Sequence, residues 1–422
     1  MDGFLEKVVL LLAFVVLLGF FNEKVTNMTY EISYMLFSVV IGAVLLLIGS
    51  MCGEQSSAKT ILENIQIFDL ESFLIKGVLC FMLFAGSCHM RLMDLKKYAC
   101  PIAILAAGAT LLGAVFYGIL FYGIGWILGL HLSIPVCLMF GSIIAPTDPI
   151  AATSILKKFN LPSGIGFIIE GESLFNDGVG VALFVCFSGL VTAQENGGFL
   201  YVMGKELFGA VLVGVAVTAV CFPVFRQTKD ETRQIFTSLL TVALAYFLCE
   251  TFGFSGAIAS VVCGILFSAL RNRQEHKGRL LGLEQFDIFW GILDTLLNSV
   301  LYVILGLSFL HILQMPYVLA LSLLAVAANL AARAGSLGVS TLFIRKLPDG
   351  YDRLSFIKLL TWGGLHGALS VALAMSTRPM LEPQTYYIVM GGTYAIVFFT
   401  TIIQGMTMQK VYQGIEKTIA KR

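Results

Sequence analysis

Apolar stretches recur from one end of the chain to the other, separated by short polar gaps. Each stretch runs for about 17–30 residues, which is long enough for an α-helix to cross a bilayer. The pattern predicts an all-α polytopic membrane protein with about 13 transmembrane helices. The expected spans are residues 4–21, 31–52, 72–90, 99–129, 133–155, 163–190, 203–225, 234–252, 255–270, 285–310, 315–344, 354–377 and 384–409.

The polar gaps alternate in charge. The gap 53–71 is acidic and the gap 191–202 has no Lys or Arg, whereas most of the 27 Lys and Arg residues fall in the alternate gaps. Cytoplasmic loops carry an excess of Lys and Arg, so the alternation predicts an odd number of spans in an integral, multi-pass protein of the plasma (inner) membrane. The N-terminus is expected outside and the C-terminus in the cytoplasm. The first apolar stretch has no strongly basic start, and we expect it to be a retained span.

Composition narrows the class of protein. The chain is 58% hydrophobic and 13% charged, where soluble domains have about 25% charged residues. A formal net charge of +1 argues against a polyanion binder, so the expected surroundings are a lipid bilayer and no nucleic acid. The nine cysteines include no CxxC pair, which suggests neither a metal site nor a disulfide framework. We expect no cofactor.

Two predicted spans contain helix-breaking sequences near their middle. Residues 145–149 read APTDP and residues 363–367 read GGLHG. Proline removes a backbone donor and glycine loosens a helix, and non-helical backbone at membrane depth is tolerated only inside protein or beside a wet cavity. One break in each half of the chain predicts a transporter with inverted repeats, two interrupted crossing helices and a site near the bilayer midplane.

Three acids lie close together within another apolar span, in the sequence EGESLFND. A charged side chain at the bilayer centre costs at least about 2.5–3.5 kcal/mol, so the cluster is expected to bind something. On a helix, Glu170, Ser173 and Asp177 share one face, and Glu172 and Asn176 form a neighbouring stripe.

We expect Ser173 and Asp177 to face Thr147 and Asp148 of the first break. Two carboxylates with hydroxyl and carbonyl oxygens form a hard, all-oxygen site that suits a small monovalent cation. Two acids that close together in a low dielectric are expected to titrate as a coupled pair. A site that binds either a proton or a cation, but not both, exchanges them by competition, which is the basis of cation/proton antiport.

Arg333 is the one arginine deep in the span 315–344. A buried carboxylate needs a partner, so we expect an ion pair between Arg333 and Glu172. The alternative is an arginine at a helix end that reaches the membrane interface.

These residues resemble a known family. EGESLFND, the APTDP turn, LLNSVLYVILG around Asn298, NLAARAGSL and WGGLHGALSVALA are together similar to monovalent cation/proton antiporters of the sodium/proton exchanger type. The resemblance covers nearly the whole chain. It implies a homodimer in which a core domain moves against a dimerisation domain. The implied ranges are 1–98 and 191–313 (dimerisation and linker), 99–190 and 314–414 (core) and 415–422 (a short cytoplasmic tail).

The resemblance also assigns roles to residues. It implies cation (Na⁺) binding at Thr147, Asp148, Ser173 and Asp177. It implies no catalytic residues. It makes Glu172 and Arg333 a structural ion pair. In this family a neutral Asn before the second Asp, here Asn176, accompanies electroneutral one-for-one exchange.

Two positions depart from the family pattern. His366 stands where Arg is usual, and it is either a titratable gate or a tolerated structural replacement. The span 72–90 lacks an acid that many relatives carry, so no ligand is expected there. Glu170 is assigned only as a candidate pathway residue.

The expected function is therefore secondary, non-enzymatic exchange of sodium or lithium for protons. The alternative within transport is a potassium/proton exchanger of the same fold, because selectivity depends on cavity size and ligand field. A cation channel is a further alternative, but it would need a selectivity filter. An intramembrane aspartyl protease also pairs acids on different helices, but its GxGD motif is missing and the one YD pair, Tyr351-Asp352, falls in a gap between predicted spans.

Overall fold

The computed structural model describes residues 4–52, 72–90, 92–148, 162–192, 198–228, 230–275, 284–309, 318–347 and 350–420. The regular structure in these ranges is helical, and every predicted span contains at least one described helix. Nine of the described helices are long and apolar enough to cross a membrane, or ten if one bent pair counts as a span. The all-helical membrane fold is confirmed, and a count of thirteen is compatible with it. Parts of the predicted spans, such as 149–155, lie outside the described residues.

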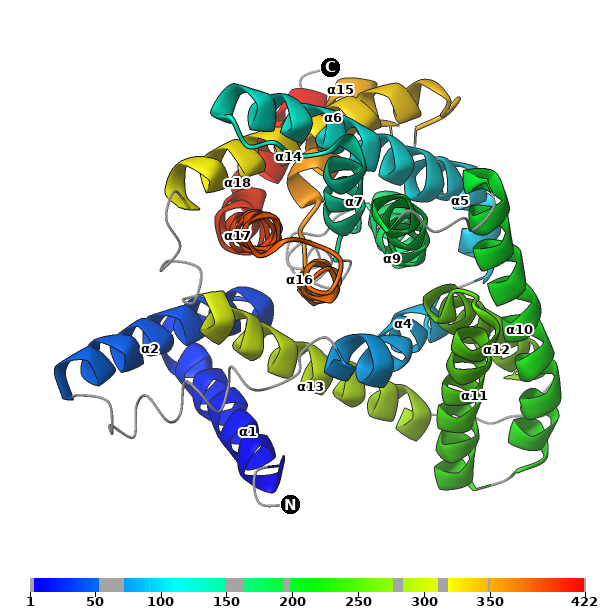
Figure 1. Cartoon of the computed structure of the whole chain (residues 1–422). Helices are drawn as coiled ribbons and strands as arrows, with labels where there is room; N and C mark the ends of the chain where they lie inside the picture. Colours follow the sequence, from blue (N-terminus) through cyan, green and yellow to red (C-terminus); the bar gives the residue numbers. More distant parts are fainter. Residues whose placement is uncertain are drawn as a thin grey trace.

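The helices form two groups, one mainly in the lower and one mainly in the upper half of Figure 1, with α10 running along the right-hand side through both halves. The lower one, which we call the α13 group, contains α1 (Phe4–Phe21), η1 (Asn22–Thr26), α2 (Tyr30–Cys52), η2 (Ser72–Val78), α4 (Leu79–Cys88), α10 (Phe199–Gln227), α11 (Glu231–Phe252), α12 (Gly256–Glu275) and α13 (Glu284–Phe309). Within it, α13 packs mainly against α2, and α4 packs mainly against α12.

The upper one, which we call the crossing group, contains α5 (Leu92–Ala103), η3 (Ile104–Ala109), α6 (Thr110–Leu128), α7 (Ile134–Ile144), α9 (Ser163–Val191), α14 (Val318–Leu342), α15 (Arg353–Gly363), α16 (Ala368–Ser376), α17 (Pro383–Phe398), η6 (Phe399–Gln404) and α18 (Gly405–Ala420). Most of its helices lie in residues 99–190 and 314–414, the ranges predicted for the core domain. Whether the two groups move as separate domains stays a prediction. The last helix, α18, runs past residue 414, and its Ile415 is buried against the crossing group.

Local sequence explains where the broken helices begin and end. Ser133 caps the start of α7 by accepting a hydrogen bond from the backbone of Val136. At its other end α7 stops at Ile144, just before Pro146, which has no N–H to donate. In the second break, α15 ends at Gly363 and α16 starts at Ala368, with a bend of 62° between them. The second predicted interruption is therefore present, and at the first one the described residues show the helix end at Ile144 and non-helical backbone as far as Asp148.

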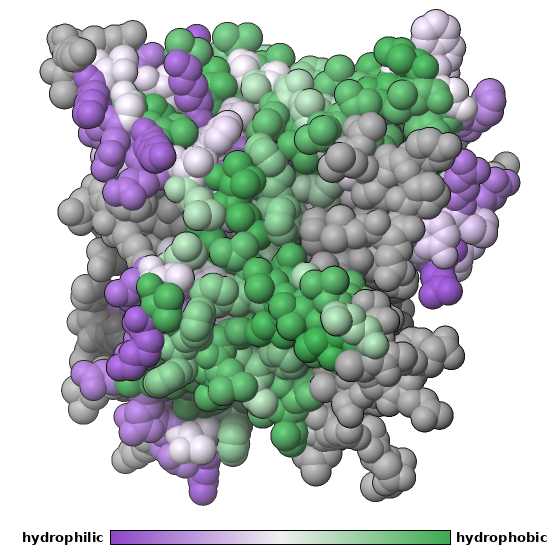
Figure 2. Space-filling model, turned by 90° about the vertical axis from the view of Figure 1, so that its left-hand side faces the viewer, coloured by the Kyte–Doolittle hydropathy of each residue, from purple (hydrophilic) through white to green (hydrophobic). Residues whose placement is uncertain are grey.

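The exterior is apolar over a broad area. Figure 2 shows one side of the molecule, where hydrophobic residues cover the middle and hydrophilic residues gather toward its edges. Large apolar side chains with more than half of their area exposed include Val16 on α1, Leu47 on α2 and Leu212 on α10. In water such a surface would be unfavourable, whereas in a bilayer it faces hydrocarbon. The fold is therefore that of an integral, multi-pass membrane protein.

Candidate ion-binding site

The two helix breaks cross and complete each other's backbone hydrogen bonds. The N–H of Asp148, in the first break, donates to the carbonyl of Leu365, in the second, at 2.7 Å. In the second break, the His366 N–H donates to Thr400 Oγ1 at 3.2 Å, and Thr401 Oγ1 donates to the His366 carbonyl at the same distance. These bonds satisfy groups that a helix would otherwise satisfy, which makes the interruption tolerable away from water.

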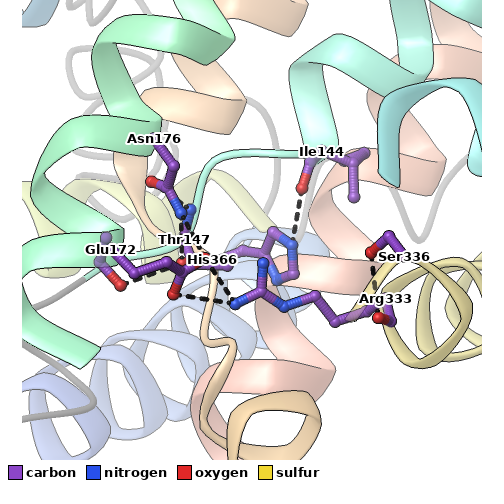
Figure 3. Close-up of polar contacts among 8 residues, drawn as sticks. Ile144, Thr147, Glu172, Asn176, Arg333, Ser336 and His366 are labelled. Atoms are coloured by element: carbon purple, nitrogen blue, oxygen red, sulfur yellow. Dashed lines mark hydrogen bonds and ion pairs between the residues drawn. The ribbon is translucent and has the colours of Figure 1, made fainter. Parts of the chain in front are cut away.

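The imidazole of His366 ties the second break to the first. Its Nε2 lies 2.7 Å from the carbonyl oxygen of Ile144, the last residue of α7 (Figure 3). A neutral imidazole that donates from Nε2 satisfies one of the carbonyls left open at that helix end. His366 is buried and is not among the residues that line the cavity described below. The contact with Ile144 links the two breaks, and both expected roles of His366, a structural replacement or a titratable gate, stay predictions.

Asn176 holds the first break against α9. Its Oδ1 accepts from the backbone N–H of Thr147 at 3.2 Å, and its Nδ2 donates to Thr147 Oγ1 at 2.8 Å (Figure 3). The same Nδ2 donates to Glu172 Oε1 at 3.2 Å. The hydroxyls of Thr147 and Ser173 lie 3.1 Å apart and share a hydrogen bond. The side-chain amide of Asn176 therefore clamps the first break to α9, because its Nδ2 donors and its Oδ1 acceptor are all engaged in hydrogen bonds.

Glu172 and Arg333 form a buried ion pair. Arg333 Nη2 lies 2.9 Å from Oε1 and 3.1 Å from Oε2 of Glu172, which joins α14 to α9 (Figure 3). Their side chains are 8% and 1% exposed, so solvent compensates neither charge. The structure brings this expected pair together inside the protein, and Arg333 does not reach a membrane interface.

Asp148 and Asp177 line one cavity of about 60 Å³. That volume has room for about four waters, or for a cation that keeps part of its hydration shell. Asp177 comes from the unbroken helix α9 and Asp148 from the first break. Asp148 also approaches the start of α16 so closely that a Cβ on Gly367 would lie 2.6 Å from its Oδ2. The positive end of the α16 dipole therefore favours negative charge on Asp148.

Of the four expected ligands, Thr147, Asp148 and Asp177 are on the cavity wall, and Ser173 is not among the lining residues. The Ser173 hydroxyl instead shares a hydrogen bond with the hydroxyl of Thr147, which is on the cavity wall. Glu170 is half-buried on α9 and also does not line the cavity. The structure therefore unites three of the expected ligands directly and the fourth through a hydrogen bond.

Three further polar residues line the cavity and were not expected there: Asn298, Tyr302 and Ser370. Tyr302 OH donates to Asp148 Oδ2 at 2.5 Å. Asn298 Nδ2 donates to the carbonyl and Oδ1 of Asp294, one turn earlier on α13. Asp294, Asn298 and Tyr302 follow each other at i, i+4 and i+8, which puts them on one helix face. That spacing was a signal in the sequence, but no pattern indicated which helix the stripe would face.

A second, smaller cavity of about 10 Å³ is lined in part by Arg333. Its lining includes Tyr117, Arg333 and His366. Among the described residues, no hydrogen-bond partner is found for Tyr117 OH, Arg333 Nε or His366 Nδ1. One water is about what such a volume could hold, and three polar atoms are enough to bind it.

Replacing Asn176 with aspartate should destabilise the fold by about 2 kcal/mol or more, because the clamp loses two donated hydrogen bonds and a carboxylate is placed beside Glu172. Asn176→Ala loses the same bonds without the added charge and should cost less. Heat-induced loss of the monodisperse peak in detergent measures both variants. An aspartate variant as stable as the wild type would contradict the assigned clamp.

An all-helical membrane protein in which two broken helices cross beside paired acids has the architecture of a secondary transporter. The sequence model of the transmembrane region of sodium/hydrogen exchangers matches residues 8–413. The chain therefore belongs to the sodium/hydrogen exchanger family.

Individual relatives agree with this assignment. The Na⁺/H⁺ antiporter NhaP of Pseudomonas aeruginosa is 29% identical over 364 residues, covering 83% of this chain and 84% of the relative. The Na⁺/H⁺ antiporter NhaH of Halobacillus aidingensis is 30% identical over 300 residues, with 68% and 70% covered. The structure of the sodium proton antiporter MjNhaP1 from Methanocaldococcus jannaschii at pH 8 aligns with a TM-score of 0.69 over 91% of this chain and 98% of that one, at 18% identity. This last likeness is one of fold.

Proposed function

We propose that the protein is a secondary transporter, and not an enzyme, that exchanges sodium or lithium for protons by alternating access. One observation carries the proposal: Asp148 and Asp177 line the same cavity from two different elements, beside the crossing of the broken helices. Membership in the exchanger family and the names of the relatives support the choice of substrates.

The residues around the cavity suggest how exchange would work. The two carboxylates and the Thr147 hydroxyl supply hard oxygen ligands, which alkali cations prefer over nitrogen or sulfur. Ser173 would act through Thr147, by fixing the direction of that hydroxyl. Protons and the cation would compete for the same two carboxylates, so that each ion leaves when the other binds.

A one-for-one, electroneutral stoichiometry fits the charges of the site. Asn176 adds no charge, and its polar atoms are engaged by Thr147 and Glu172. The charge of Glu172 is balanced by Arg333. The charges left for transport would therefore be those of Asp148 and Asp177. Exchange is electroneutral when one proton and one sodium ion alternate on this pair, because the pair then has the same net charge of −1 in both loaded forms.

Competition has a pH dependence that can be measured. Where protons occupy the site, lowering the pH by one unit should raise the apparent KM for sodium up to about tenfold, while the maximal rate at saturating sodium stays the same. The reason is that a competitor changes how much cation is needed and not how fast the loaded protein moves. Sodium titrations of proteoliposomes at several symmetric pH values test this. A maximal rate that falls with pH at constant KM would exclude simple competition.

The deciding experiment is a proteoliposome assay in which sodium, lithium and potassium are added separately against a pH gradient. Membrane potential is clamped in one arm and free in the other. Sodium- and lithium-driven proton flux that does not depend on potential supports the proposal. Flux with potassium alone would make the protein a potassium/proton exchanger, and flux without a proton counter-ion would make it a channel.

The assembly and the orientation are also proposed. We expect a homodimer formed through the α13 group, in a plasma (inner) membrane, with the N-terminus outside and the C-terminus in the cytoplasm. The basic gaps between the spans support this orientation. Mass measurement of the purified protein, and labelling of a cysteine introduced near either terminus in intact cells, test the two points.

A further inference from the structure

Tyr302 joins the two helix groups through the ion site. It belongs to α13, whereas the Asp148 carboxylate that accepts the hydrogen bond from its hydroxyl belongs to the crossing group. Tyr302 is 2% exposed, so the donor of this bond is shielded from bulk water. The cavity lies between the groups, with α4 and α13 on one side and the first break, α9 and α16 on the other.

The strength of this bond depends on what Asp148 holds. A hydroxyl that donates to an ionised carboxylate makes a charge-assisted bond, roughly twice as strong as one between neutral groups. A proton on Asp148 turns it into a neutral acceptor. A cation bound to Asp148 draws on the same oxygen lone pairs and repels the positive end of the hydroxyl. Both ions therefore weaken the bond between Tyr302 and Asp148, and the naked carboxylate strengthens it.

We propose that Tyr302 is a catch that holds the crossing group in place while Asp148 carries neither ion. This inference rests on the proposed exchange. In alternating access the crossing group would move relative to α13, which would break the bond from Tyr302 to Asp148. In the empty protein this movement costs the full strength of the bond. In the cation-loaded and protonated forms the bond is weaker, so these forms move more easily. The catch therefore favours obligatory exchange, because the unloaded protein returns slowly.

Tyr302→Phe tests the catch because it removes the hydroxyl and keeps the ring. Two results are expected in proteoliposomes. The apparent KM for sodium should fall several-fold, because a competitor for Asp148 is gone. Sodium efflux into sodium-free medium of low proton concentration should rise about tenfold above the wild type and become dependent on membrane potential, because the empty, charged protein can return.

Tyr34→Phe is the matched control. Tyr34 is a buried tyrosine on α2, in the same helix group, and is not among the residues that line the cavity. It should exchange like the wild type with no potential-dependent efflux. If Tyr302→Phe yields no folded protein, Tyr302→Leu provides the same test, with folding judged by elution profile and thermal stability.

The outcomes are separable. A wild type that does not exchange sodium for protons overturns the proposed function and this inference with it. A wild type that exchanges, beside a Tyr302→Phe variant with unchanged KM and unchanged efflux, overturns the catch alone. A raised KM in that variant also overturns it, because the hydroxyl would then be a cation ligand.

Discussion

Asp177→Asn is expected to abolish sodium-dependent proton flux, and Asp148→Asn separately is expected to do the same, with at least about a hundredfold loss of rate in each case. Each substitution keeps the size of the side chain and removes one of the two negative charges on the cavity wall. A site with one remaining charge has lost both a cation ligand and a group that accepts a transported proton. Neither variant should unfold, because an amide in the cavity can still hydrogen-bond.

The measurement is proton flux in proteoliposomes, read from a dye trapped inside, after a pulse of sodium. Asp230→Asn is a suitable control, because Asp230 caps the start of α11 at an exposed position and asparagine caps a helix equally well. It should behave as the wild type. Wild-type flux in either cavity variant, at equal protein incorporation, would remove that residue from the proposed site.

The sequence predicted the parts of the fold that depend on neighbouring residues. Apolar length alone indicates a membrane span, and the closely spaced prolines of APTDP and glycines of GGLHG disfavour regular helix at those positions. The spacing of Glu172 and Asn176 placed them one above the other on a helix, and they are hydrogen-bonded as that spacing allows.

Contacts between distant segments were harder to predict. Tyr302 contacts Asp148 across 154 positions, and His366 contacts the carbonyl of Ile144 across 222. Both contacts depend on the angle at which helices cross, which the hydrophobic pattern does not encode. Ser173 illustrates the same limit in a shorter contact. Its helix face was foreseen, but Thr147 lies between its hydroxyl and the cavity wall.

Arg333→Ala is expected to cost about 3–5 kcal/mol of stability, because it leaves the Glu172 carboxylate buried without its partner. Asn176 can compensate only in part, since it donates one bond of 3.2 Å to that carboxylate. Thermal unfolding in detergent, followed by size-exclusion fluorescence, measures the loss. Arg233→Ala is the control: Arg233 pairs with Asp230 at the surface, where its side chain is 78% exposed, and exposed pairs contribute about 0–1 kcal/mol.

The double variant Glu172→Gln/Arg333→Met separates the cost of an unpaired charge from the worth of the pair itself. If the loss in Arg333→Ala comes from the stranded carboxylate, removing both charges should recover most of the stability, as it does when buried ion pairs are replaced as a unit. Glutamine can still accept the hydrogen bond from Asn176 Nδ2, so the clamp on Thr147 should persist. A double variant that melts as early as Arg333→Ala would instead mean that the bond from Arg333 to Glu172 is itself what holds α14 against α9.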